Sequence, residues 1–244
     1  MLIDVLPSAG SPWMPALKNK VAVVIDVFRA TSTMVTAFSN GCRAIIPVLT
    51  TEEALERRTN EPGYLLGGER RALPIEGFDV GNSPYDYVTE KVGGKTIIMT
   101  TTNGTRAIHA VAEARQVWIA SFLNAGSVVD AINQYIRKNS EIDGIVIICA
   151  GSEDRFDIPD TLCAGMLVDM LGKDMESNDL GRAAQMLYNI SKDRLHETLS
   201  MSEHGRLLQS IGYEKDVSYC AQPNILSITP VLEDGVVIAR TEII

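Results

Sequence analysis

Short apolar runs alternate with helix-like segments along most of this chain, and this alternation limits the folds that it can adopt. The runs have the length and composition of β-strands, and they are Leu2–Leu6, Val21–Asp26, Ala44–Leu49, Tyr64–Leu66, Lys95–Thr100, Gln116–Ala120 and Gly144–Ala150. Between or after them lie segments with helical periodicity, which are Ser32–Asn40, Thr51–Arg58, Pro84–Lys91, Ser127–Lys138 and Asp160–Leu171. Because parallel strands need crossover helices, the pattern predicts an α/β fold with a largely parallel sheet covered on both faces.

The last third of the sequence has a different pattern. Leu180–Ile190 and Ser191–Ile211 are expected to be helices, with Gly212 as the stop signal. The segment "SITPVLEDGVVIAR" then places two β-rich runs around Glu-Asp-Gly, which indicates a C-terminal β-hairpin and therefore a mixed sheet. We expect residues 1–244 to form a single domain, with a subdomain at about 172–244, because no linker or low-complexity segment divides the chain.

Composition and charge argue against several classes of protein. The chain has 244 residues, 45% of them hydrophobic, and a net charge of −9 without any Lys/Arg run, so we expect no nucleic-acid partner. It has no run of about 18 apolar residues and no export signal at its start, so we expect no membrane span and a cytoplasmic location. The four cysteines form no C-x-x-C pair, which argues against a zinc site and against a disulfide framework.

Three of the apolar runs end in the same chemical pattern. "VVIDVFRATST", "IIMTTTNGTRAI" and "IVIICAGSEDRF" each pass into small polar residues and then an arginine, which is Arg29, Arg106 or Arg155. Nearby hydroxyl groups belong to Thr31, Ser32, Thr33, Thr101, Thr102 and Thr105. Guanidinium groups and helix N-termini favour anions, and ligands of open α/β sheets bind outside the carboxyl ends of the strands. These residues are therefore candidates for anion binding, although Ser and Thr before a helix also serve as caps.

Carboxylates are expected at the same edge of the sheet. Six acidic residues follow apolar runs or lie in the long irregular segment Gly67–Ser83, and they are Asp26, Glu69, Asp79, Glu153, Asp154 and Asp160. Acidic groups repel a phosphate unless a cation lies between them, and hard oxygen ligands suit Mg²⁺. The sequence therefore predicts Mg²⁺-assisted chemistry on a phosphorylated anion. As alternatives, Asp160 could stabilise a helix N-terminus, and Glu153 and Asp154 could form a solvated turn.

Other motifs in the sequence are not expected to carry the chemistry. Cys149-x₅-Arg155 has the spacing of a cysteine-dependent phosphatase loop, but Glu153 and Asp154 inside it oppose phosphate binding and a reactive thiolate. The glycines form neither a P-loop nor a dinucleotide-binding fingerprint. The histidines have no metal-ligand spacing, and "SEHG" around His204 favours a surface or core histidine over a site residue.

Several longer motifs, in one order along the chain, resemble the 2-phosphosulfolactate phosphatase family. They are "DVFRATST" at Asp26–Thr33, "GGER" at Gly67–Arg70, "GFDVGNSP" at Gly77–Pro84 and "TTNGTRA" at Thr101–Ala107. The stretches "AGSED" at Ala150–Asp154 and "IPDTLCAG" at Ile158–Gly165 are similar to the family too, and the likeness returns at "SEHG" and in the C-terminal hairpin. Because the motifs occur together, the likeness is more specific than any one of them.

The resemblance implies a Mg²⁺-dependent phosphatase with a three-layer α/β/α fold. Such an enzyme would hydrolyse (2R)-2-phospho-3-sulfolactate to 3-sulfolactate and phosphate, a step toward coenzyme M. The motif positions that match the family give the site candidates Asp26, Arg29, Glu69, Asp79, Asn82, Thr102, Asn103, Arg106 and Asp160.

The resemblance and the residue chemistry together predict three sets of roles. The catalytic candidates are Asp26, Arg29, Arg106 and Asp160. The candidate ligands for Mg²⁺ are Asp26, Glu69, Asp79 and Glu153. The candidates for substrate binding are Thr31, Ser32, Arg70, Asn82, Thr102, Asn103, Gly104, Thr105 and Arg155.

Several alternatives stay open from the sequence. The substrate could be another phosphorylated hydroxy acid, or the chain could be a non-catalytic anion-binding protein. Water could attack the phosphoryl group directly, or Asp26 could first form an aspartyl-phosphate. The expected partner is a small anionic phosphorylated substrate, and a homodimer is the default expectation because two-fold dimers are the commonest oligomers.

Overall fold

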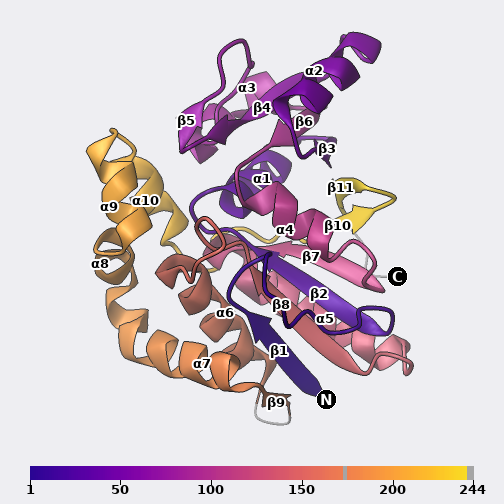
Figure 1. The fold of residues 1–244 in the computed structure, drawn as a ribbon, viewed down its shortest axis with the longest axis vertical. Helices are drawn as coiled ribbons and strands as arrows, with labels where there is room; N and C mark the ends of the chain where they lie inside the picture. The colour runs from indigo at the N-terminus through magenta and orange to yellow at the C-terminus, as the bar shows by residue number, and fades with distance from the viewer. Residues whose placement is uncertain (173–174, 241–244) are drawn as a thin grey trace.

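A single mixed sheet forms the centre of the molecule (Figure 1). The computed structural model describes residues 1–172 and 175–240. In this part of the chain, eleven strands follow the order β5-β4-β6-β3-β11-β10-β7-β2-β8-β1-β9. The strands are β1 (Leu2–Leu6), β2 (Lys20–Ile25), β3 (Ala44–Pro47), β4 (Leu65–Arg70), β5 (Leu73–Pro74), β6 (Thr96–Thr100), β7 (Gln116–Ala120), β8 (Gly144–Cys149), β9 (Glu176–Ser177), β10 (Pro230–Glu233) and β11 (Val236–Ala239).

Helices cover both faces of this sheet, and most of them connect consecutive strands. The α-helices are α1 (Ala30–Ser39), α2 (Thr51–Asn60), α3 (Thr89–Val92), α4 (Gly104–Ala110), α5 (Ala125–Lys138), α6 (Ile158–Leu171), α7 (Asp179–Ser191), α8 (Leu195–Ser200), α9 (Glu203–Ser210) and α10 (Glu214–Cys220). Short 3₁₀ turns are η1 (Pro84–Asp86), η2 (Phe122–Asn124) and η3 (Lys192–Arg194). None of the helices in the described ranges is long and apolar enough to cross a membrane.

Alternation along β2 explains the three layers. The side chains of Val21, Val23 and Ile25 belong to one buried cluster, which also contains residues of α5 and α6. The side chains of Ala22 and Val24 belong to a second buried cluster with residues of α1 and α4. Because successive side chains of a strand point to opposite faces, this central strand is buried on both sides. The predicted three-layer α/β/α fold with a largely parallel, mixed sheet is therefore confirmed.

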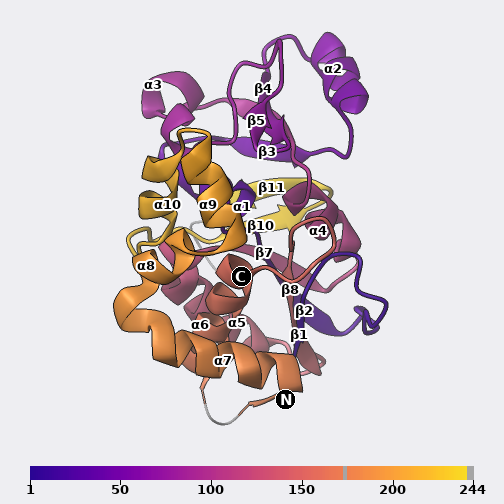
Figure 2. The same ribbon diagram turned by 60° about the vertical axis from the view of Figure 1, so that its left-hand side comes forward.

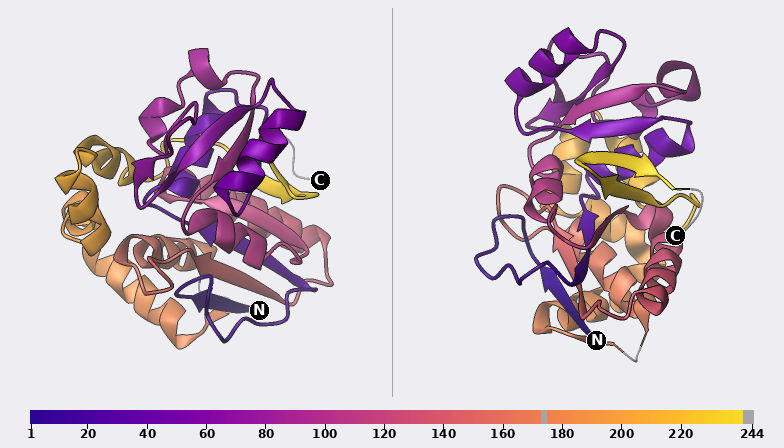
Figure 3. Two further views of the ribbon diagram at one scale, coloured as in Figure 1. Left: turned by 45° about the horizontal axis from the view of Figure 1, so that its top comes forward. Right: turned by 90° about the vertical axis from the view of Figure 1, so that its right-hand side faces the viewer.

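The C-terminal hairpin joins two parallel blocks of strands. Strands β4, β6 and β3 form one block, and β7, β2, β8, β1 and β9 form the other. Hairpin β10–β11 lies between them, turning at Asp234 and Gly235, which both have positive φ (Figure 3). Since β10 is antiparallel to β7 and β11 is antiparallel to β3, the two blocks run in opposite senses through the ladder.

This topology changes the reason why the strand ends meet. The sequence predicts one edge at which all parallel strands end, whereas the structure has two blocks of opposite sense. Twisted sheets rotate by roughly 20–25° per strand, so the five steps from β2 to β6 accumulate about 100–125° and turn the two carboxyl ends toward each other. Asp26 after β2 and Gly104 after β6 are accordingly in contact: a Cβ built on Gly104 would lie 2.7 Å from Asp26 Oδ2.

Three predicted segments differ from the structure. Pro84–Lys91 is not one helix but η1 and the short α3, and Ser191–Ile211 is divided into η3, α8 and α9. The long segment Gly67–Ser83 begins as strand, since β4 continues to Arg70. Its Gly68 has φ 133°, and a Cβ there would lie 1.9 Å from the carbonyl oxygen of Thr100, so only glycine allows β4 to approach β6 this closely. Gly67 and Gly68, which open the segment predicted as a loop, therefore lie in strand β4.

The helices α8, α9 and α10 stack along one side of the molecule, beside the carboxyl end of β2 (Figures 1 and 2). Their segment falls in the predicted subdomain at about 172–244, of which residues 173–174 and 241–244 lie outside the described residues. The same segment also supplies β10 and β11 to the central sheet. The helices are attached to the sheet through contacts of α10 with the segment that follows β2, and these contacts border the site described next.

Candidate active site

A cavity of about 250 Å³ lies where the ends of β2, β4, β6 and β8 meet helix α9. Its volume equals roughly eight water molecules, so it suits a small ligand. The lining residues come from six separate segments, and they are Asp26, Phe28, Arg29, Glu69, Arg71, Ala72, Asn82, Thr102, Asn103, Ser152, Glu153, His204 and Leu207. Seven of the predicted site residues are in this set, and the structure thereby brings together segments far apart in the sequence.

Asp26 is a buried carboxylate at the end of β2, with 7% of its surface exposed. Its Oδ1 accepts a hydrogen bond from the amide of Ala30 at the start of α1, 3.1 Å away. Burial raises the pKa of Asp26 to about 7, and the nearby carboxylates of Glu69 and Asp157 act in the same direction. Arg29 lowers the pKa only in part. A cation at this point would offset the repulsion among these carboxylates.

Glu69 binds the backbone of two neighbouring turns. Its Oε1 accepts a hydrogen bond from the amide of Thr102 at 2.7 Å, and its Oε2 accepts one from the amide of Ala72, also at 2.7 Å. The Thr102 hydroxyl lies 3.2 Å from Oε2. The side chain is 6% exposed and lines the cavity beside Asp26. Glu69 thus connects the end of β4 with the end of β6.

Asp160 and Asp157 extend the acidic cluster behind the cavity. Asp160 accepts hydrogen bonds from the amides of Val27 at 2.8 Å and Gly151 at 3.0 Å, so it ties the segment after β2 to the segment after β8. Burial, with Asp157 and Asp26 nearby, raises the pKa of Asp160 well above its usual range. Burial also raises the pKa of Asp157 to about 7, and Glu203 adds to the effect. Asp160 therefore holds the loops in position, and it does not line the cavity.

Two amide oxygens at the cavity are buried without a hydrogen-bond partner among the described residues. They are Oδ1 of Asn82 and Oδ1 of Asn103. Asn82 is 4% exposed, and both residues line the cavity. Because an unsatisfied buried polar atom costs about 1–3 kcal/mol, its presence calls for an explanation such as an ion or ligand. Both oxygens are ligands of the type that Mg²⁺ accepts.

Arg29 lines the cavity but is already paired on its other side. Its Nη1 donates to Oδ2 of Asp216 at 2.7 Å, and its Nη2 donates to the carbonyl oxygen of Ala72 at 2.6 Å. Its guanidinium carbon lies 4.1 Å from the centroid of the Tyr213 ring. Asp216 also accepts a hydrogen bond from Ser83 at 2.7 Å. The arginine thus fixes α10 to the site and keeps the remaining donors of its fork for a ligand.

The predicted hydroxyl donors are engaged with the backbone. The hydroxyl of Thr31 donates to the carbonyl of Asp26, that of Ser32 to Val27, and that of Thr105 to Thr101, at distances of 2.9–3.0 Å. These three residues are buried and do not line the cavity. They are not N-caps either, because they lie within the first turns of α1 and α4, whose cap residues Arg29 and Asn103 make no side-chain capping hydrogen bond. Their hydroxyls instead tie each first turn to the segment before it.

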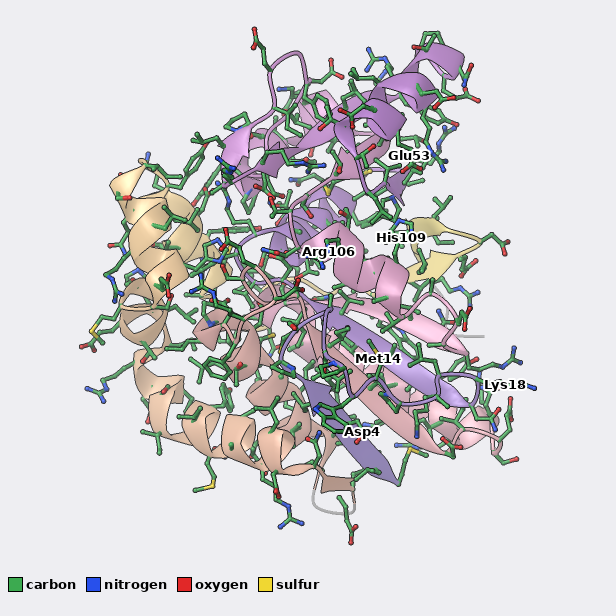
Figure 4. The ribbon with its side chains drawn as sticks, in the orientation of Figure 1. Asp4, Met14, Lys18, Glu53, Arg106 and His109 are labelled. Carbon is green, nitrogen blue, oxygen red and sulfur yellow. The ribbon has the colours of Figure 1, made fainter. Side chains whose placement is uncertain are left out.

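Four other predicted residues lie outside this cavity, and Glu153 lines it only at the rim. Asp79 accepts hydrogen bonds from the amide of Leu66 and from Arg58, which lower its pKa, and it lies outside the cavity. Arg70 turns away to the hydroxyl of Thr100, 2.7 Å from its Nη2. Arg106, which projects from α4 (Figure 4), pairs with Asp154 at 3.1 Å, and Arg155 lies 3.6 Å from Glu153. Glu153 itself lines the cavity with a side chain that is 77% exposed.

The structure adds residues that the sequence did not single out for the site. Arg71 lines the cavity next to Glu69, and His204 lines it from α9. Burial lowers the pKa of His204 to about 4, assisted by the charge of Arg29, so the imidazole is neutral at pH 7. A second cavity of about 190 Å³ shares Ser152 and His204 with the first and contains Asp157. The motif "SEHG" was the available signal for His204, and no motif pointed to Arg71.

Cys149, the alternative nucleophile, is fully buried in the sheet. Burial raises the pKa of its thiol well above the usual range, and Asp160 and Cys163 nearby act in the same direction. A thiol in this state is a poor nucleophile. The interpretation of Cys149 as a core residue is therefore supported.

The donor set of the cavity fits a divalent cation. Within residues 1–172 and 175–240, no group of three or more His, Cys, Asp or Glu side chains is arranged to hold a metal ion. Mg²⁺, however, commonly takes one or two carboxylates together with waters and substrate oxygens. Asp26 and Glu69 supply two carboxylates, and Asn82 and Asn103 supply amide oxygens without partners. The fold and this site define the class as an α/β enzyme with a small cavity lined by charged and amide side chains.

Comparison with known proteins identifies the family. The model of the family described as 2-phosphosulpholactate phosphatase matches residues 12–235. A protein of Clostridium novyi (strain NT), named a probable 2-phosphosulfolactate phosphatase, is 41% identical over 234 residues, which cover 94% of this chain and 96% of the relative. Proteins with the same name are 44% identical in Caldanaerobacter subterraneus subsp. tengcongensis (91% of both chains) and 41% identical in Thermotoga petrophila (98% of this chain and 99% of the relative).

The chain therefore belongs to the 2-phosphosulfolactate phosphatase family, which is a family of phosphoric monoester hydrolases. The resemblance predicted from the sequence motifs is confirmed. The matched region contains each residue that lines the cavity.

Proposed function

We propose that this protein is a Mg²⁺-dependent phosphatase that hydrolyses (2R)-2-phospho-3-sulfolactate to 3-sulfolactate and phosphate. Family membership supports the substrate, and the cavity supports a reaction on a small anion. The observation that carries the proposal is the convergence of Asp26 and Glu69 with the unpartnered oxygens of Asn82 and Asn103 in one cavity. Carboxylates in such a cavity would repel a phosphorylated substrate unless a cation is bound with it.

Asp26 and Glu69, with the amide oxygens of Asn82 and Asn103, are the residues that we propose to hold Mg²⁺. The ion would neutralise charge on the phosphoryl oxygens during transfer. Asp79, which was predicted as a ligand from the sequence, lies outside the cavity and is left out of this set. Glu153 lines the rim with an exposed side chain, so it contributes at most through water.

Arg29 and Asp26 are the residues that we propose to act on the phosphoryl group. The guanidinium of Arg29 is held by Asp216 and by the carbonyl of Ala72, so its remaining N–H groups are fixed in direction before the substrate arrives. Prearranged donors of this kind stabilise charge without reorganisation in the transition state. Asp26 would either attack phosphorus or orient an attacking water. Rapid quench with mass spectrometry separates these routes, because only the first gives a phosphorylated Asp26 peptide.

Phosphate release from purified protein tests the proposal. Protein treated with a chelator should release little phosphate from phosphosulfolactate, and added Mg²⁺ should restore the rate. Asp26→Asn should lower kcat/KM by at least about a hundredfold. Asp143→Asn is the matched control, because Asp143 is exposed and pairs with Lys20 at the opposite end of β2.

The outcomes separate the alternatives. Turnover of phospholactate or phosphoglycolate at a rate higher than that of phosphosulfolactate would replace the proposed substrate with another phosphorylated hydroxy acid. Binding without phosphate release, with or without Mg²⁺, would identify a non-catalytic anion-binding protein. The proposal places the enzyme in the cytoplasm, where its four buried free cysteines would stay reduced. Its place on a route to coenzyme M rests on the family resemblance alone.

A further inference from the structure

The turn between β4 and β5 has an unusual backbone and borders the cavity. It is the two-residue loop of Arg71 and Ala72, which follows Arg70 of β4, and the two residues have φ of 51° and 66°. A two-residue hairpin loop of type I′ requires positive φ at both residues, a conformation that costs energy for residues other than glycine, asparagine and aspartate. The conformation is held from both ends of Ala72: its amide donates to Glu69 Oε2, and its carbonyl accepts from Arg29 Nη2. Two buried residues of the cavity thus determine the path of this turn.

The turn sends its two arginines in different directions. The guanidinium of Arg70 folds back, with Nη1 bonded to the carbonyl of Glu69 and Nη2 bonded to Thr100 Oγ1 and, at 3.2 Å, to the carbonyl of Leu49. Arg71 lines the cavity instead. Its guanidinium makes no hydrogen bond or ion pair with any residue in the described part of the chain, whereas its amide lies 3.4 Å from Thr102 Oγ1. Arg71 therefore presents an unengaged cation to the cavity.

The two cationic side chains of the cavity differ in whether an acidic residue already neutralises them. Of the described residues that line it, Arg29 and Arg71 carry a positive charge. Arg29 is 2% exposed and is neutralised by Asp216 at 2.7 Å. Arg71 is exposed and has no acidic partner in the residues described. A substrate with three anionic groups, whose phosphoryl group lies at Asp26, still has two further groups to match, and Arg71 is the cation placed at the outer part of the site.

We propose that Arg71 is the residue that recognises the sulfonate of the substrate, an inference that rests on the proposed function. In phosphosulfolactate the sulfonate is attached through a methylene group, so its oxygens reach one bond farther from the phosphate-bearing carbon than the carboxylate oxygens do. The group that reaches farther matches the exposed Arg71, because the buried Arg29 lies beside Asp26 at the phosphoryl end of the cavity. A guanidinium fork pairs two donors with two sulfonate oxygens, as it does with phosphate and carboxylate.

A comparison of substrates tests this assignment. The rates of wild type and Arg71→Gln are measured on phosphosulfolactate, on phospholactate (which lacks the sulfonate) and on 2-(phosphonooxy)ethanesulfonate (which lacks the carboxylate). Arg71→Gln should lower kcat/KM about 10- to 150-fold on both sulfonates, the range for a charged hydrogen bond, and leave phospholactate turnover within about twofold. The loss should come mainly from KM, since a group that does not react binds ground and transition states alike.

Two further variants control for charge and fold. Arg71→Lys keeps the charge but loses the fork, so it should recover part of the loss on the sulfonates. Arg57→Gln changes an exposed arginine of α2 and should leave all three rates unchanged. Melting temperatures of the variants within about 1–2 °C of wild type would confirm that the fold is retained.

The results distinguish failure of this inference from failure of the proposed function. Equal losses on all three substrates, or a loss on phospholactate but not on 2-(phosphonooxy)ethanesulfonate, would overturn the sulfonate assignment while wild type still hydrolyses phosphosulfolactate. No loss with Arg71→Gln on any substrate would overturn it as well. Absence of turnover of phosphosulfolactate by the wild-type protein with Mg²⁺ would instead refute the proposed function.

Discussion

Replacing Asp216 by alanine should destabilise the protein far more than its position at the edge of the fold suggests. Asp216 and Arg29 pair at 2.7 Å, and their side chains are 3% and 2% exposed. Removal of one partner leaves a buried guanidinium without a counter-charge, a change that costs about 3–5 kcal/mol. Ser83 loses its acceptor on Asp216 at the same time. Because domains are stable by only about 5–15 kcal/mol, this loss is a large fraction of the total.

Equilibrium unfolding in urea measures the loss. With a slope of about 2–3 kcal/mol per molar for a chain of this size, the midpoint of Asp216→Ala should fall by about 1–2 M. Arg57→Ala is the control, since its exposed ion pair with Glu53 lies on α2, away from the helix α10 that carries Asp216 (Figure 1). It should cost less than about 0.5 kcal/mol. The double variant Arg29→Met/Asp216→Leu removes both charges and should be more stable than Asp216→Ala alone. If Asp216→Ala and Arg57→Ala shift the midpoint equally, the reasoning about the buried pair is refuted.

Three other changes test separate parts of the account. Gly104→Ala places a methyl group 2.7 Å from Asp26 Oδ2 and should lower kcat at least tenfold in the phosphate-release assay. Gly63→Ala is the control, because a Cβ there meets nothing within 4 Å, and it should leave kcat unchanged. Asp157 has its pKa raised to about 7 when folded, so it contributes stability that is present below about pH 4 and lost as the pH rises through 7. Through Asp157, the unfolding free energy of the wild type should therefore fall by up to about 1.4 kcal/mol per pH unit between pH 4 and 7, and Asp157→Asn should remove this part of the fall. Denaturation at several pH values measures the slope of unfolding free energy against pH. Identical slopes for wild type and variant would contradict this. Glu69→Gln should raise the Mg²⁺ concentration needed for half-maximal rate, and an unchanged requirement would remove Glu69 from the metal set.

Periodicity and local turn chemistry determined most of the fold that could be predicted. Strand β7 and the start of α2 are found where the sequence predicts them, because alternation and capping are properties of neighbouring residues. The hairpin was identifiable from Glu-Asp-Gly. Its position between two blocks of opposite sense was not, because that depends on pairing between residues more than a hundred positions apart, as in Val231 and Trp118.

In the site, too, residues within local motifs could be predicted, whereas contacts between distant segments could not. Asp26, Glu69 and Asn82 were found because each lies within a motif that resembles the family. Whether Arg70 or Arg71 lines the cavity depends on the left-handed conformation of Arg71 and Ala72, which a hydrogen bond from Arg29 to the carbonyl of Ala72 holds in place. Arg29 is distant in the sequence, so no local pattern predicts which arginine lines the cavity. The role of Asp216 also escapes the sequence, since its partner is 187 positions away.

The central claim is that a divalent cation and the substrate's phosphoryl group share the cavity at Asp26. A crystal structure of the protein with Mn²⁺ in place of Mg²⁺ and with sulfolactate and phosphate, using anomalous scattering, tests it most directly. If the proposed site is right, an anomalous peak lies at the carboxylates of Asp26 and Glu69, with phosphate beside it and the sulfonate at Arg71. A peak at Asp79 or at the exposed carboxylates of the β8–α6 loop, with the cavity free of anion, would contradict it.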